Sequence, residues 1–321
     1  MNGLNFRVQA AFLLSFLFFL LAAFRPVGLN HDTGLYIAQV KAYFIEDGVR
    51  YPDLLFNGLA KLISSIVGSF SPSGEGTGRV FLVIMALFES VLMFTILRRK
   101  KSAVEATLMA FGFGPLIFLD IMRQGTAMLL AGVFFSGKTR KYLLMVGALA
   151  THVVAVVSLL LLSLTKKNAW ILAILAAVMA LVVVFVLQHA LTLRYDYYMR
   201  TGGYLLGKGD FSLEKVMGMF SVSNIIVLLF MFFGYKVGSF TLQESVVVVM
   251  LYLLSIYIPL LYRLYLFYFF CMASSRDMLR TGDQIAGFLS LKQIMGVMFN
   301  MGYAIILLRF SIGAFVYFDP K

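Results

Sequence analysis

The sequence has few charged residues. They make up 13% of its 321 residues, about half of the roughly 25% that is usual in soluble domains. Hydrophobic residues make up 61%, and a soluble globule of this size cannot bury so many apolar side chains. The composition excludes a disordered chain and argues against a soluble enzyme. It indicates an all-α, polytopic integral membrane protein.

The sequence also has one cysteine and three histidines. Cys271 cannot form an intrachain disulfide. His31, His152 and His189 lack the spacing of zinc ligands, so we expect no metal and no cofactor. Lys and Arg exceed Asp and Glu by 27 to 15, giving a net charge of +12. These basic residues are scattered between apolar runs and form no basic domain, so we expect no nucleic-acid partner.

Long apolar runs follow one another along the chain. The first, Val8–Phe24, has about the length that a bilayer requires. We predict roughly 9–11 transmembrane or half-membrane helices in a single transmembrane domain, 1–321. The later runs are Val80–Leu97, Ala106–Leu119, Ala127–Phe135, Tyr142–Leu164, Trp170–Leu187, Val216–Gly234, Val246–Phe270 and Ile285–Leu308.

Two polar segments separate these runs. Segment 25–78 mixes apolar and polar residues, and within it Leu35–Ile45 and Leu54–Val67 are typical of amphipathic helices at a membrane surface. The Ser-, Pro- and Gly-rich run 71–78 predicts a loop. A second polar loop covers 192–215. We expect both segments to be external.

Short basic clusters suggest an orientation, because such loops usually face the cytoplasm. They lie at 98–101, 138–141, 166–167 and 276–280. If all four face the cytoplasm, Tyr142–Leu164 must be a hairpin with its apex near His152. Each arm then has about 11 residues, or ~16 Å, half of a ~30 Å hydrocarbon core. The alternative is one ordinary span over these residues.

Three arginines occupy the outer ends of apolar runs on this topology. They are Arg25, Arg123 and Arg263, the last at the apex of a second predicted hairpin. An arginine that points into a membrane cavity is costly and indicates a functional site, and its planar fork suits phosphate. Three converging arginines could hold a pyrophosphate. The alternative for each is that its side chain extends to the membrane interface.

Two residues are candidate bases. Asp32 follows the first span, and His152 lies in an apolar setting. Either could accept a proton from a sugar hydroxyl. Asp32 could instead cap a helix, and His152 could be a buried core residue. Glu89 lies within an apolar run, where we expect a structural hydrogen bond or ion pair; the alternative is a proton relay.

Tyrosine and arginine are concentrated in the second polar loop. Tyrosine offers both a ring face and a hydroxyl, which suits stacking on sugars. The alternative is the aromatic belt of a membrane interface. The candidate sugar-binding residues in this loop are Arg194, Tyr195, Tyr197, Tyr198 and Arg200.

Several motifs, in order, resemble a known family. The segment Arg25–Tyr36, Arg-Pro-Val-Gly-Leu-Asn-His-Asp-Thr-Gly-Leu-Tyr, resembles the opening signature of the EpsG branch of Wzy-type polysaccharide polymerases. That signature is an Arg after the first span, a Gly, an Asp and a Tyr four residues on. The segment 123–127, Arg-Gln-Gly-Thr-Ala, is similar to the family's Arg-Gln-x-x-Ala, although Thr126 stands where an apolar residue is usual.

Two later elements extend the resemblance. Thr151-His152 resembles the family's His after a short apolar arm, and the segment 262–265, Tyr-Arg-Leu-Tyr, resembles a late Arg/Tyr element. The resemblance implies that Tyr36 and Gln124 also bind the sugars of the substrate. It implies a GT-C-like fold with an extracytoplasmic cavity, in a multi-pass protein of the bacterial inner membrane with its active site on the periplasmic side.

The resemblance also implies a reaction. Such enzymes transfer a growing glycan from undecaprenyl pyrophosphate onto a lipid-linked oligosaccharide repeat, during synthesis of O-antigen, capsule or exopolysaccharide. The expected partners are this lipid-linked oligosaccharide, the bilayer, and the chain-length regulator and flippase of the same pathway. One alternative is an O-antigen ligase or another GT-C transferase that uses the same donor. A glycolipid transporter is a further alternative, although transporters usually contain internal repeats and we find none.

Overall fold

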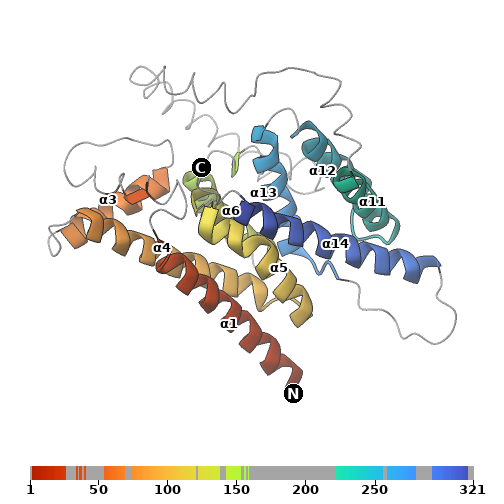
Figure 1. The fold of residues 1–321 in the computed structure, drawn as a ribbon, viewed down its shortest axis with the longest axis horizontal. Coiled ribbons are helices and arrows are strands. Elements are labelled where there is room, and N and C mark those ends of the chain that lie inside the picture. Colours follow the sequence, from red (N-terminus) through yellow and green to blue (C-terminus); the bar gives the residue numbers. More distant parts are fainter. Residues whose placement is uncertain are drawn as a thin grey trace. The chain divides into compact units, whose positions relative to one another are not determined.

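The computed structural model describes residues 2–26, 54–68, 74–120, 122–137, 142–152, 222–255, 259–279 and 291–316, with single residues in 34–40 and 155–158. Within these residues the fold is all-helical (Figure 1), with ten α-helices and one π-helix. This confirms the predicted all-α class. Two helices in the described part are long and apolar enough to cross a membrane, Phe6–Ala23 and Gly76–Leu97.

The chain divides into two compact units. Unit 1 comprises 1–153, 274–276 and 307–321, and unit 2 comprises 154–273 and 277–306. The helices of unit 1 are α1 (Asn2–Ala23), α3 (Leu54–Gly68), α4 (Gly74–Leu97), α5 (Ala103–Pro115), the π-helix η2 (Leu116–Asp120), α6 (Met122–Ser136) and α7 (Tyr142–Thr151). Unit 2 holds α11 (Val222–Lys236), α12 (Leu242–Leu254) and most of α13 (Pro259–Ser275) and α14 (Leu291–Val316).

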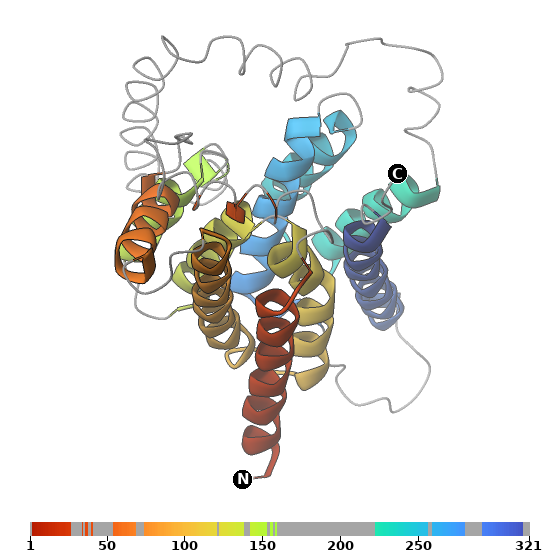
Figure 2. The same ribbon diagram turned by 60° about the vertical axis from the view of Figure 1, so that its left-hand side comes forward.

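Helices α1 and α4 of unit 1 run antiparallel and lie side by side (Figure 2). At one end Arg7 Nη1 donates to the carbonyls of Lys100 and Lys101, at 3.1 and 3.0 Å. At the other end Arg79 Nη1 donates to the carbonyl of Arg25, at 3.3 Å. Arg7 and Arg25 are separated by ~27 Å of helix, close to the ~30 Å hydrocarbon thickness of a bilayer. We call these the Arg7 end and the Arg25 end of unit 1.

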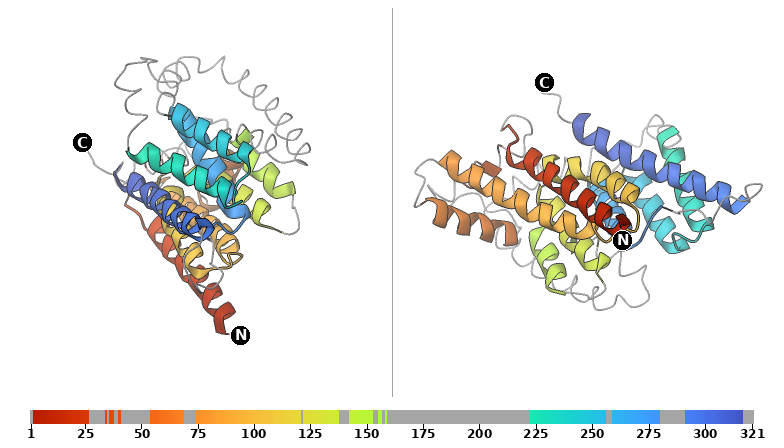
Figure 3. Two further views of the ribbon diagram at one scale, coloured as in Figure 1. Left: turned by 90° about the vertical axis from the view of Figure 1, so that its right-hand side faces the viewer. Right: turned by 90° about the horizontal axis from the view of Figure 1, so that it is seen from below.

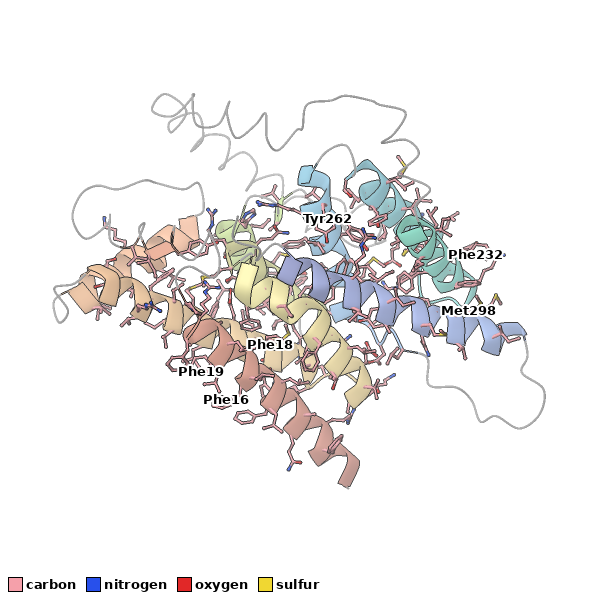
Figure 4. The ribbon with its side chains drawn as sticks, in the orientation of Figure 1. Phe16, Phe18, Phe19, Phe232, Tyr262 and Met298 are labelled. Atoms are coloured by element: carbon pink, nitrogen blue, oxygen red, sulfur yellow. The ribbon has the colours of Figure 1, made fainter. Side chains whose placement is uncertain are left out.

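The two sides of α1 have different environments. Phe18 is buried and stacks on Phe118, with ring centroids 5.5 Å apart. A Cβ on Gly114 would lie 2.5 Å from the Phe18 ring, so glycine lets α5 approach α1 closely. Phe16 and Phe19 lie on the opposite side of α1 (Figure 4), and Phe16 is exposed. An exposed apolar side of this kind is typical of a lipid-facing helix.

The prediction of a loop over 71–78 was wrong from Gly74 onward, because α4 begins there. Gly78, in the second turn of α4, allows close packing. A Cβ on Gly78 would lie 2.9 Å from Ile37 Cγ2 and 3.0 Å from Ile37 Cα. The absent side chain therefore lets the backbone at Ile37 pack directly against α4.

The predicted helix Leu54–Val67 is α3, which ends one residue later. Ala60 and Ile63 are buried, whereas Leu62 is exposed, so one side of α3 packs inward as an amphipathic helix does. Its buried side joins an apolar cluster with Tyr36, Ile37, Val40, Phe81, Leu82, Met85 and Met122. The other predicted amphipathic helix, Leu35–Ile45, lies mostly outside the described residues.

The return from α5 to α6 passes through the π-helix η2. A Cβ on Gly125 would lie 2.8 Å from Ile117 Cγ2, so α6 packs closely on η2. From Met122 to Phe134, α6 is buried at all but one position. The polar first turn of α6 is therefore also inside the protein. For this reason the buried part of α6 is longer than the apolar run Ala127–Phe135 that the sequence shows.

Helix α7 confirms the break predicted near His152. It begins at Tyr142, whose ring lies 5.7 Å from that of Phe134, and it ends at Thr151. Its ten residues rise only ~15 Å. Residues 155, 156 and 158 are helical again. The return arm of the hairpin beyond residue 158 lies outside the described residues and stays a prediction.

Basic residues join the helices at the Arg7 end of unit 1. Lys100 forms a buried ion pair with Glu105, with Nζ 3.1 Å from Oε1, and also donates to the Arg276 carbonyl. Arg99 Nη1 donates to Ser136 Oγ at 2.8 Å. The cluster at 98–101, which the sequence analysis used to infer orientation, therefore also holds helix ends together.

Unit 2 is packed through aromatic rings. Phe230 of α11 stacks on Phe299 of α14, with centroids 4.9 Å apart, and α11 and α14 run side by side (Figure 3). A capping box joins Thr241 and Glu244 at the start of α12, which fixes where that helix begins.

The predicted position of the second hairpin apex was wrong. Helix α12 ends at Leu254 and α13 begins at Pro259, so the interruption comes before Arg263, which lies inside α13. The first turn of a helix favours proline because its missing N–H is not needed there. The last run was also predicted too early, since α14 covers Leu291–Val316 instead of ending at Leu308. The run Trp170–Leu187 and the loop 192–215 lie outside the described residues.

Candidate functional site

Arg25 lies just beyond α1, and its side chain turns back into unit 1. Only 3% of the residue is exposed. Its Nη1 donates to the carbonyl of Phe118 in η2, at 2.7 Å. An arginine whose side chain extended to the membrane interface would be exposed. The burial of Arg25 therefore favours a guanidinium that faces into unit 1 over one that reaches the interface. The π-helix supplies the carbonyl that holds it, and π-helical turns are frequent at functional sites.

Arg123 lies in the first turn of α6, at the same end of unit 1. Its Cζ lies 5.8 Å from the centroid of the Tyr36 ring, which makes a cation–π contact. Tyr36 itself is 3% exposed. The structure thus brings together two residues, 87 positions apart in the sequence, that the family resemblance had singled out separately.

Arg79 is a further basic residue at this end that the sequence analysis did not assign to the site. It donates to the Arg25 carbonyl, as described above. The sequence contains a feature that could have identified it, because Arg79 directly precedes an apolar run just as Arg25 directly follows one. We call Arg25, Arg79 and Arg123 the arginine cluster.

Polar side chains continue from the cluster into the apolar interior. Glu89 of α4 is fully buried, and its Oε1 accepts a hydrogen bond of 2.6 Å from Thr126 Oγ1 of α6. The expectation of a structural hydrogen bond at Glu89 is therefore confirmed. Gln124, one residue after Arg123, is also buried.

His152 lies at the C-terminal end of α7 and is 8% exposed. Helix α7 packs along α6 and starts near the far end of α6, beside Phe134. Because α6 is ~22 Å long and α7 rises ~15 Å, His152 lies within about 10 Å of the start of α6 along the helix axis. The structure therefore places His152 in the same half of unit 1 as the arginine cluster.

The described structure does not test the remaining candidate residues. Arg263 lies on α13 in unit 2, where it is exposed. The candidate base and the candidate sugar-binding residues of the second polar loop lie outside the described residues: Asp32, Arg194, Tyr195, Tyr197, Tyr198 and Arg200.

The arginine cluster suits an anion. Guanidinium groups bind phosphate oxygens through paired N–H donors, and partial burial strengthens these bonds by lowering the local dielectric. Across the part of the chain that the structure describes, no group of three or more His, Cys, Asp or Glu side chains could hold a metal ion.

The fold and site define a helical membrane protein with one buried and two partly buried arginines at one end of its apolar bundle. The family comparison agrees: the model of the EpsG family matches residues 10–316, and the chain belongs to the EpsG family. It is a membrane protein of the polysaccharide-polymerase type and, at this coarse level, an enzyme of the glycosyltransferase kind. Comparisons with curated proteins and with solved structures gave no match.

Proposed function

We propose that the chain is a repeat-unit polymerase. It transfers a growing glycan from undecaprenyl pyrophosphate onto an incoming oligosaccharide repeat that is linked to the same kind of carrier. One observation carries the proposal: Arg25 and Arg123, both within the family's motifs, lie at one end of an apolar bundle about as long as a bilayer is thick. A lipid-linked pyrophosphate has its headgroup at that depth, with its prenyl chain beside the apolar helices.

The chemistry requires a base and a site for the leaving group. The bond between the sugar anomeric carbon and the pyrophosphate oxygen breaks, and a bond from that carbon to an acceptor hydroxyl forms. The arginine cluster stabilises the negative charge that develops on the departing pyrophosphate. The proton of the acceptor hydroxyl passes to Asp32 or His152. The burial of His152, in the same half of unit 1 as the arginine cluster, supports it as one of these two candidates.

Substrate sugars require further groups. We assign Tyr36 and Gln124 to this role, together with the tyrosines and arginines of loop 192–215, and Arg263 as a third pyrophosphate ligand. Tyr36 has a second contribution, because its ring holds the Arg123 guanidinium. The buried amide of Gln124 suits a hydrogen bond to a sugar hydroxyl.

The proposed location is the bacterial inner membrane, with the Arg25 end on the periplasmic side. The distribution of charge supports this orientation, because the Arg7 end contains the compact basic cluster at 98–101 and such clusters usually face the cytoplasm. A flippase would then deliver the lipid-linked repeat to the Arg25 end, and a chain-length regulator would act on the same side. The GT-C-like arrangement with an extracytoplasmic cavity belongs to the same proposal.

Elongation by the purified protein tests this function. The wild-type chain, incubated with a defined undecaprenyl-pyrophosphate-linked repeat, should produce a ladder of longer glycans without an energy source. Arg123→Ala should slow elongation by about a hundredfold, as removal of a charge-stabilising group does. Arg98→Ala is the matched control, because Arg98 is an exposed arginine at the Arg7 end, and it should elongate normally.

Two results would contradict the proposal. One is wild-type protein that makes no glycan longer than a single repeat. The other is wild-type protein that transfers glycan only when lipid A is supplied as the acceptor, which would identify a ligase instead.

A further inference from the structure

Helices α11 and α12 of unit 2 form a hairpin that has a groove along one side. The turn between them is short, from Val237 to Thr241, and Gly238 adopts a φ of 74°, which favours glycine. The groove between the two helices has a volume of about 280 Å³, near the lower end of the range for ligand sites. It is large enough to hold part of an elongated molecule.

The walls of this groove are apolar, and most of them are exposed. Phe232 points outward from α11 (Figure 4), and both Phe232 and Val246 of α12 are exposed. Met231, also in the wall, is buried. Lipid tails are as apolar as these side chains, so the groove suits an acyl chain better than a polar ligand.

One polar side chain interrupts the apolar walls. Ser245 lies in the first turn of α12 and lines the groove. The residue is 8% exposed, and its hydroxyl makes no hydrogen bond to the residues that the structure describes. A buried hydroxyl without a partner is costly, and this hydroxyl could donate to an ester carbonyl. The groove therefore contains an unused donor about one turn from the end of the hairpin.

Lys236 brings a positive charge to the same end of the groove. It is the last residue of α11 and follows Tyr235, which lines the groove. The Lys236 ammonium lies 5.7 Å from the centroid of the Phe232 ring, so the lysine side chain folds back over the groove wall. Glu244 is buried and does not line the groove, and its Oε2 accepts a hydrogen bond of 3.0 Å from the backbone N–H of Thr241. The charge at this end of the groove is therefore positive.

The three kinds of group match the parts of a glycerophospholipid. A tyrosine and a lysine at the end of an apolar helix are typical of the level of the membrane headgroups. At that level the Lys236 ammonium would meet a phosphate, and the Ser245 hydroxyl, about one turn deeper, would meet an ester carbonyl. Basic pockets between membrane helices bind anionic headgroups in this way.

We propose that the groove between α11 and α12 binds an anionic membrane phospholipid. Lys236 binds the headgroup phosphate, Ser245 donates to an ester carbonyl, and the apolar walls hold one acyl chain. A zwitterionic lipid binds less well, because the cation of its headgroup opposes Lys236. The phospholipid is not a substrate, so the inference does not depend on the proposed function.

Thermal unfolding of the whole chain in detergent tests this site, because a ligand that binds the folded state raises the unfolding midpoint. Phosphatidylglycerol should raise the midpoint of the wild-type protein more than phosphatidylcholine does. Glycerol 3-phosphate, which has the phosphate but no acyl chain, should leave it unchanged. Titration with phosphatidylglycerol gives its Kd.

Two basic residues provide a variant and its matched control. Lys236→Ala should raise the Kd of phosphatidylglycerol about fivefold, as expected for one lysine at the membrane surface. Arg98 also lies beside the ring of the phenylalanine four residues earlier, with Cζ 5.5 Å from the Phe94 centroid, but it does not line the groove. Arg98→Ala should therefore bind phosphatidylglycerol as wild type does.

Ser245→Ala is a second variant, which keeps the charge of Lys236. It removes a hydroxyl that makes no hydrogen bond, so without added lipid its unfolding midpoint should equal or exceed that of wild type. Its Kd for phosphatidylglycerol should rise about threefold, because the hydrogen bond to the lipid is lost.

The proposal is overturned if Lys236→Ala and Ser245→Ala both bind phosphatidylglycerol as wild type does. It is also overturned if Arg98→Ala weakens binding as much as Lys236→Ala, because the attraction would then come from the basic surface as a whole. A midpoint shift with glycerol 3-phosphate as large as that with phosphatidylglycerol would show that the groove is not used. Equal binding of phosphatidylcholine and phosphatidylglycerol would contradict a site for an anionic lipid.

Discussion

Arg25 Nη1 donates a hydrogen bond of 2.7 Å to the backbone carbonyl of Phe118, 93 residues further along the chain. This bond joins the end of the first membrane span to the π-helical turn before α6. It places the guanidinium inside unit 1, at the end where Arg79 and Arg123 also lie. The position of Arg25 is therefore set by packed helices, which gives the proposed site a rigid basis.

The hydrogen bond from Arg25 to the Phe118 carbonyl predicts that lysine cannot replace Arg25 in elongation. A guanidinium has donors on several nitrogens and can bond a carbonyl while binding phosphate, whereas a lysine ammonium is a single point charge. Arg25→Lys should therefore reduce the elongation rate by about a hundredfold, with membrane abundance near wild type. Elongation within about twofold of wild type would show that only the charge of Arg25 matters.

The ring of Tyr36 should matter more than its hydroxyl for holding Arg123. Tyr36→Phe keeps the ring below the guanidinium and should stay within about threefold of wild-type elongation. Tyr36→Leu removes the cation–π contact and should cost about tenfold. Steady-state elongation rates of the two variants provide the comparison. Equal losses in both would assign the effect to the hydroxyl and a sugar contact.

Glycine in α5 predicts a difference in stability between two matched substitutions. Gly114→Ala would place a Cβ 2.5 Å from the Phe18 ring, and such overpacking costs about 1–3 kcal/mol. Gly58→Ala in α3 has nothing within 4 Å of the new Cβ and should gain up to about 1 kcal/mol in helix propensity. Thermal unfolding in detergent should therefore move in opposite directions. A Gly114→Ala protein as stable as wild type would contradict the close packing of α1 on α5.

The two charges of the buried ion pair at the Arg7 end should make coupled contributions to stability. The Lys100 and Glu105 side chains are 3% and 1% exposed. Lys100→Met leaves Glu105 buried without its partner and should destabilise the protein by about 3–5 kcal/mol. The double variant Lys100→Met/Glu105→Gln removes both charges and should recover much of that loss. Thermal unfolding of both variants measures this, and additive losses would show that the two charges are not coupled.

The sequence predicted the features of the fold that depend on local composition. The span α1 follows from an uninterrupted apolar run, and α3 follows from its amphipathic pattern. The break at His152 required an additional argument from the basic clusters on either side of Tyr142–Leu164. In each case, the composition and the lengths that a bilayer imposes were sufficient.

The errors arose at residues whose structural role depends on a tertiary packing partner and not on the local sequence. The glycines near Gly78 were interpreted as a loop signal, whereas they allow close contact between α4 and Ile37. Pro259 lies inside the predicted run Val246–Phe270, where it begins α13, so the helix is interrupted before Arg263 and not at it. Local patterns identify such residues as unusual without showing which packing partner explains them.

The candidate site was predicted in part. Motifs identified Arg25 and Arg123, and the structure places both at the Arg25 end of unit 1. Arg79 was missed because it lies in no family motif, and its connection to the site is a hydrogen bond to a backbone carbonyl. The coupling of Glu89 to Thr126 joins two helices 37 residues apart in the chain, a relationship that no local pattern encodes.

Binding of undecaprenyl pyrophosphate to the purified protein tests the central claim most directly. The variants are Arg25→Ala and Arg123→Ala, with Arg98→Ala at the opposite end of unit 1 as the control. We predict that each of the first two weakens binding by at least about tenfold, while Arg98→Ala binds as wild type does. Equal affinity in all four proteins, or a loss confined to Arg98→Ala, would contradict the assignment of the pyrophosphate site to the arginine cluster.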